Sequence, residues 1–153
     1  MQIITYLAVG LLVGLVSLPS SAHEFWMEPS DFQPKVGDVV TVDLVIGTHF
    51  DGFSLPYTPD EIAAFGLIDA AGTTPITGRF GDMPAGQFTA TEAGLSLLYH
   101  QTTPSYVKYT KPEKFISFAV EKGFADVAAH YKNQTSENFR LVEKYRRFVK
   151  SLI

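Results

Sequence analysis

The chain has 153 residues, with 12 Lys and Arg side chains against 16 Asp and Glu, and it contains no cysteine. This length fits one domain or little more, and an acidic balance without a basic cluster argues against nucleic-acid binding. The lack of cysteine excludes disulfides, thiolate metal sites and a cysteine nucleophile. With 46% hydrophobic and 13% aromatic residues, the composition is that of a folded protein.

Residues 1–22 are predicted to be a secretory signal peptide. They carry no charged side chain, residues 3–16 are mainly apolar, and Ser20 and Ala22 fit a small-residue cleavage site. A membrane-spanning helix needs about 20 apolar residues, and Pro19 interrupts this stretch, which disfavours an uncleaved anchor. Cleavage after Ala22 would make His23 the first residue of a protein that is periplasmic or secreted and not embedded in a membrane.

The pattern from residue 23 to residue 110 predicts short β-strands. A first run covers residues 23–27, and in residues 39–46 the apolar side chains alternate with a period of two. Residues 65–69 and 74–77 flank Ala71-Gly72 and indicate a hairpin. Further strands are expected at residues 87–91, 95–100 and 105–109. Short strands separated by turn signals are typical of an immunoglobulin-like β-sandwich.

From residue 111 the spacing of apolar residues becomes helical. Pro112 suits the first turn of a helix that Gly123 can end, and a second short helix is expected over residues 124–131. A third helix is predicted to begin at Ser136. Its apolar stripe would consist of Phe139, Val142, Tyr145 and Val149. The predicted domains are a signal peptide (1–22), a β-sandwich (23–110) and a helical extension (111–153).

The strongest candidate site is a metal site built on His23 as the first residue of the mature chain. Its α-amine and ring Nδ1 would form a chelate, and one further imidazole would complete a three-nitrogen site, a histidine brace. Nitrogen ligands suit copper, nickel and zinc. The amine must lose a proton before it can bind a metal ion. This deprotonation costs little free energy near neutral pH, because the reference pKa of the α-amine is about 7.7–8.0.

Two other histidines are candidates for the third nitrogen ligand. If the first two predicted strands are antiparallel neighbours, His49 lies at the same end of the sheet as His23. His100 ends another predicted strand and is the second candidate, whereas His130, on a predicted helix, ranks last. Two carboxylates could add an oxygen ligand: Asp51 and Glu24.

Two other interpretations stay open. The histidines can be incidental in a module that binds a non-metal ligand or a protein through an aromatic surface. The aromatic residues in question are Phe25, Trp26, Phe50 and Phe53, although such residues more often belong to a sandwich core. The third interpretation is a copper mono-oxygenase that uses the brace, and the small size of the chain argues against it.

Several ordered segments carry a resemblance to a known family. The segments are residues 23–29, 45–52, 81–86, 113–115, 121–123 and 145–152. In this order and spacing the chain resembles the DUF4198 family of bacterial secreted proteins, often described as NikM-like or as a periplasmic component of cobalt/nickel uptake. The resemblance runs along the whole mature chain.

The resemblance implies a non-enzymatic periplasmic protein that binds nickel or cobalt during uptake, with an inner-membrane metal transporter as a partner. His23 and His49 match histidines typical of the family, whereas the resemblance does not lead us to expect a histidine at the position of His100. Family members usually continue past the segment that matches residues 145–152. The resemblance therefore also implies a chain that lacks the family's C-terminal part.

Overall fold

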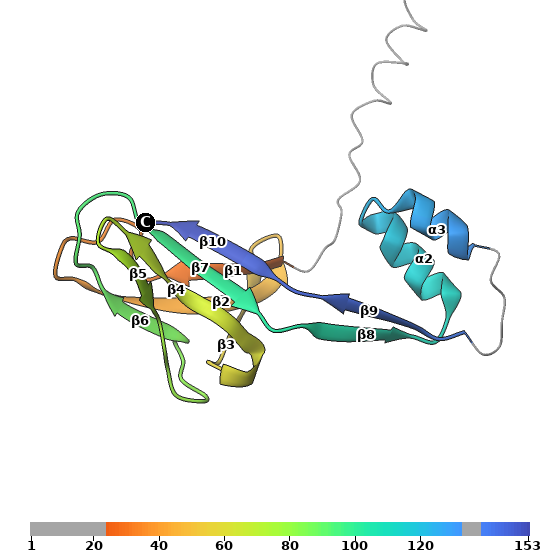
Figure 1. Cartoon of the computed structure of the whole chain (residues 1–153), viewed down its shortest axis with the longest axis horizontal. Coiled ribbons are helices and arrows are strands. Elements are labelled where there is room, and N and C mark those ends of the chain that lie inside the picture. The colour runs from red at the N-terminus through yellow and green to blue at the C-terminus, as the bar shows by residue number, and fades with distance from the viewer. Residues whose placement is uncertain (1–23, 133–138) are drawn as a thin grey trace, which may run out of the picture.

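The computed structural model describes residues 24–132 and 139–153. Figure 1 shows a body of two β-sheets, from which a two-stranded ribbon leads to two short helices. All strand pairs in these sheets are antiparallel. The predicted mainly β class is confirmed, and the immunoglobulin-like connectivity stays a prediction.

The first sheet forms around one long strand. It contains β1 (Glu24–Pro29), β2 (Val39–Thr48), β3 (Asp51–Leu55) and β6 (Gly86–Thr89). β1 pairs with one edge of β2, while β3 and β6 share the other edge. The predicted alternation in β2 is confirmed, because Val40, Val42 and Leu44 are all buried on one face.

The second sheet has the order β10-β7-β4-β5. Its strands are β4 (Ile62–Asp69), β5 (Gly72–Pro75), β7 (Leu97–Thr102) and β10 (Phe148–Leu152). A short 3-10 helix, η1 (Pro59–Glu61), precedes β4. The predicted hairpin around Ala71-Gly72 is confirmed by the pairing of β4 with β5.

The two sheets share one hydrophobic core. Its buried members come from both sheets and the loops between them: Met27, Val40, Val42, Leu44, Tyr57, Phe65, Leu67, Ile76, Ala85, Phe88 and Leu98. Removing this apolar surface from water is the main favourable contribution to the fold. His100, at the end of β7, is buried in the same interior with 3% of its surface exposed.

The ribbon and the helices form a smaller unit. β8 (Ser105–Tyr109) pairs with β9 (Leu141–Tyr145), and between them lie α2 (Pro112–Glu121) and α3 (Ala125–Tyr131). Both predicted helices are confirmed. Pro112 occupies the first turn of α2, and Gly123 follows that helix with a φ of +79°, a conformation that suits glycine. Figure 1 shows this unit projecting from one end of the body.

The predicted third helix is wrong. Leu141–Tyr145 and Phe148–Leu152 are the strands β9 and β10, and β10 pairs with β7 in the second sheet. The valines and aromatic residues of this segment favour strands, and pairing with β8 and β7 outweighs the helical spacing. The segment after the two helices therefore returns to the body, while Ser136 lies outside the described residues.

Within residues 24–132 and 139–153, no helix has the length and apolar character required to cross a membrane. The predicted signal peptide, residues 1–22, lies outside the described residues.

Candidate functional site

The first two strands are antiparallel neighbours, which is the condition on which the placement of His49 near His23 depended. β1 and β2 are antiparallel, and Glu24 at the start of β1 lies opposite Gly47 near the end of β2. His49 follows β2 directly and is exposed. His23 lies outside the described residues, but its neighbour in the chain, Glu24, is thus beside the segment that carries His49.

His49 occupies an unusual two-residue turn. Thr48 pairs with Asp51, so His49 and Phe50 alone connect β2 to β3. Both have positive φ angles, 55° and 58°, as in the type I′ turn, where Asn-Gly is the common sequence. Histidine is among the residues that tolerate this region, whereas a bulky residue such as Phe50 rarely adopts it. The turn therefore needs support from outside its own sequence.

β1 supplies this support through two side chains. The backbone N–H of Phe50 donates a hydrogen bond to the Glu24 carboxylate, with a distance of 2.8 Å between N and Oε2. The ring of Trp26 contacts the ring of Phe50 edge to face, with centroids 5.6 Å apart, a favourable aromatic geometry. The first residues of β1 thus fix the turn that displays His49.

Two glycines let β2 and β3 approach closely beside the turn. Gly47 pairs with Gly52, and a Cβ atom built on Gly52 would lie 2.9 Å from the Cα atom of Gly47. A side chain at either position would meet backbone atoms of the opposite strand, which have little freedom to move. The hairpin that carries His49 therefore depends on this glycine pair.

The described residues include three possible metal donors near this turn but no complete metal site. His49, Asp51 and Glu24 come from adjoining ends of three strands, but no group of three or more His, Cys, Asp or Glu side chains able to hold a metal ion occurs in residues 24–132 and 139–153. One imidazole and flanking carboxylates are a donor set that transition metals accept. A three-nitrogen site at this turn would need nitrogen atoms from His23.

His100 lies in a different environment from His49. Its ring is buried between the rings of Phe25 and Phe65, with centroid distances of 5.3 Å and 5.4 Å. Burial lowers its pKa from 6.5 to about 4. The sequence contained a signal for this placement, because His100 is two residues from Leu98 and therefore shares the inward face of β7. His130, the last-ranked candidate, is exposed on α3.

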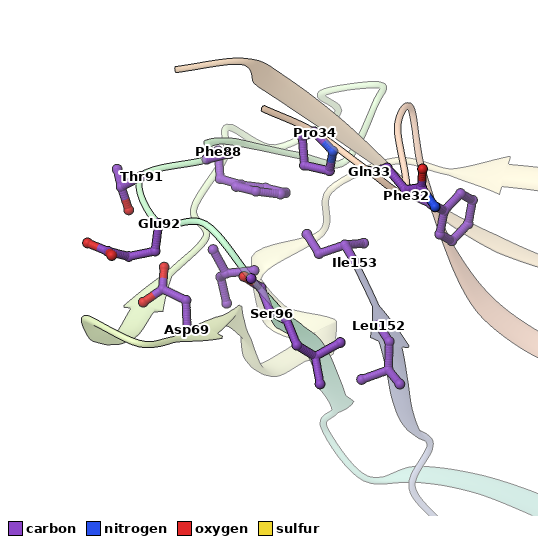
Figure 2. A pocket seen from close by; sticks show the side chains of 14 residues that line it. Phe32, Gln33, Pro34, Asp69, Phe88, Thr91, Glu92, Ser96, Leu152 and Ile153 are labelled. Carbon is purple, nitrogen blue, oxygen red and sulfur yellow. The ribbon is translucent and has the colours of Figure 1, made fainter. Parts of the chain in front are cut away.

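A hollow of about 470 Å³ opens beside the C-terminal residues of β10, and His49 does not line it. Figure 2 shows Asp69, Thr91 and Glu92 on one side of it, and apolar side chains that include Leu152 and Ile153 on the other. Asp69 already accepts hydrogen bonds from the backbone N–H groups of the β4–β5 turn. Its carboxylate therefore has a structural role there, and no histidine lines the hollow.

The family model described as a domain of unknown function, DUF4198, matches residues 20–153. The chain belongs to the DUF4198 family. The match includes both the two-sheet body and the helices of this DUF4198 protein. Comparisons with curated proteins and with solved structures find no match. Family membership thus carries no assigned activity, and the functional argument depends on the geometry of the site.

Proposed function

We propose that this DUF4198 protein is a periplasmic or secreted protein that binds a transition-metal ion for uptake or buffering, and that it is not an enzyme. The observation that supports this proposal is the way β1 holds the His49 turn. Glu24 and Trp26 stabilise a turn that its own residues, His49 and Phe50, disfavour. Strained backbone held by its surroundings is concentrated at functional sites.

The proposed ligands are His23 and His49. Cleavage after Ala22 would give His23 a free α-amine, and His23 is bonded directly to Glu24, which lies opposite Gly47. The amine and imidazole of His23 would then combine with the imidazole of His49. Asp51 and Glu24 are the nearby oxygen donors, although Glu24 already binds the turn amide.

The metal in this proposal is the cargo of the protein. Nitrogen-rich sites favour Cu(II) and Ni(II), and the resemblance described above adds cobalt. Because His49 is exposed, a bound ion would be accessible for transfer, and the proposed recipient is an inner-membrane metal transporter.

Replacing His49 tests this proposal. For the protein purified after export, we expect His49→Ala to weaken Cu(II) and Ni(II) binding by more than about 100-fold, since loss of a direct ligand should exceed the 10–100-fold effects of residues that only orient ligands. The matched control is His130→Ala, because His130 is exposed on α3. Isothermal titration calorimetry measures the affinities, and circular dichroism verifies the fold.

An unchanged affinity in His49→Ala, or an equal loss in His130→Ala, would contradict the proposed site. One observation favours a second function in that case. Phe50 and Phe53, on the same hairpin, are 78% and 66% exposed. Exposed aromatic side chains are enriched in protein interfaces, so a protein without metal affinity would be interpreted as a ligand- or protein-binding module.

A further inference from the structure

His100 is a buried polar side chain without a polar partner. Only 3% of its surface is exposed, and neither Nδ1 nor Nε2 has a hydrogen-bond partner among the described residues. The edge-to-face contacts with Phe25 and Phe65 pack the ring but leave both nitrogens unpaired. Burying an unpaired polar group costs about 1–3 kcal/mol. A hydrogen-bond partner for the imidazole would remove this cost.

A cavity adjoins the His100 ring. It has a volume of about 290 Å³ and lies between the two sheets, at the end of the body from which the ribbon leaves. Its apolar walls come from both sheets and their loops: Phe25, Leu44, Ile46, Leu55, Pro56 and Ile62. An apolar protein cavity of about 150 Å³ can bind benzene. The space beside His100 is therefore large enough for a ring-sized organic molecule.

The charges around the cavity favour an uncharged occupant. His100 is neutral at pH 7 because burial lowers its pKa to about 4. The charged residues in the lining are Glu61, which is exposed, and Arg147, which is half-buried, so they lie toward solvent and have opposite signs. The guanidinium of Arg147 also lies over the Tyr145 ring, 4.9 Å from its centroid. No net charge remains to attract an ion into the interior.

We propose that this cavity binds a small uncharged molecule that has an apolar body and a hydroxyl group, and that the hydroxyl group hydrogen-bonds to the imidazole of His100. A neutral imidazole offers one donor and one acceptor, and a hydroxyl group can pair with either. The apolar body fills the space between the walls that the two sheets supply. The site is independent of the proposed metal site, because His49 does not line the cavity.

Phenol and toluene are the probes that test this proposal, because they differ in one hydroxyl group and match in shape. Binding is measured by NMR titration of the protein with ¹⁵N-labelled histidine. We expect phenol to bind at least about tenfold more tightly than toluene, which is the effect of one hydrogen bond to a buried group. We also expect phenol to shift the ring-nitrogen signals of His100.

His100→Phe is the decisive variant, since it keeps an aromatic ring between Phe25 and Phe65 but removes both nitrogens. In this variant we expect the preference for phenol to disappear while toluene still binds. His130→Phe is the matched control and should retain the preference, because His130 is exposed on α3. Even if His100→Phe does not fold, comparing the affinities of phenol and toluene for the wild-type protein tests the proposal.

Three results would overturn the proposal. The first is a wild-type protein whose His100 signals respond to neither probe, as for a cavity that holds only water. The second is equal affinity for phenol and toluene. The third is a folded His100→Phe variant that still prefers phenol.

Discussion

Lowering the pH from above 6.5 to 4 is expected to reduce the free energy of unfolding by about 3 kcal/mol through His100 alone. Burial lowers the pKa of His100 from 6.5 to about 4 in the folded protein. The unfolded chain therefore takes up this proton first as the pH falls. The contribution of His100 to stability is complete above pH 6.5 and is lost progressively between pH 6.5 and pH 4.

Urea unfolding across this pH range measures the effect. Other groups also titrate in acid, so the informative quantity is the difference between the wild-type protein and His100→Phe. As the pH falls, we expect the difference in free energy of unfolding between the two proteins to shift by about 3 kcal/mol in favour of the variant, which lacks the His100 proton uptake. His130→Phe should follow the wild-type curve. Parallel curves for wild type and His100→Phe would mean that His100 is not buried as described.

Gly47→Ala is expected to destabilise the protein by about 2–3 kcal/mol, the upper range for forcing atoms into a well-packed site. A Cβ atom on Gly47 would lie 2.5 Å from the Cα atom of Gly52 and 2.7 Å from the carbonyl carbon of Asp51. Replacing a strand glycine by alanine would otherwise gain roughly 0.5–1 kcal/mol. The clash is with backbone atoms and exceeds this gain, so the net effect is a loss.

The loss should be concentrated in the β2–β3 hairpin. We expect urea unfolding to give the lower stability, and NMR to show shifted signals in residues 47–52 and weaker metal binding. Thr48→Ala is the matched control, because it truncates the adjacent half-buried residue without adding atoms. A Gly47→Ala variant as stable as the wild-type protein would show that the two strands are farther apart than described.

Part of the framework around the His49 turn could be predicted from the sequence. The alternation in β2 predicted its buried face, and the antiparallel pairing of β1 with β2 placed His49 beside the start of β1. β3 was missed because Asp51-Gly52 is typical of a turn and not of a strand. Its pairing depends on the contact between Gly47 and Gly52, which is a tertiary feature.

Residues 139–152 show how local spacing can mislead. Phe139, Val142, Tyr145 and Val149 fit one face of a helix, yet the same segment also alternates between half-buried and exposed residues from Leu141 to Lys150. Pairing of β9 with β8 and of β10 with β7 stabilises the strand period over the helical one. Pairing across such long sequence distances is not visible in a local pattern.

The candidate site was predicted in part. The position of His49 followed from the order of the strands, but the support of its turn by Glu24 and Trp26 depends on side-chain geometry. His100 was grouped with the metal ligands because it ends a strand. His100 is two residues from the buried Leu98, so the strand period places its side chain on the inward face. The cavity beside His100 forms only when both sheets are assembled.

The most direct test of the proposed function is Cu(II) binding to the exported protein with a free or an acetylated N-terminus. Mass spectrometry first establishes whether the mature chain begins at His23, and electron paramagnetic resonance then reports the nitrogen ligands. The proposal predicts tight 1:1 binding with three nitrogen ligands, lost both on acetylation and in His49→Ala. Weak binding that is indifferent to acetylation would contradict it.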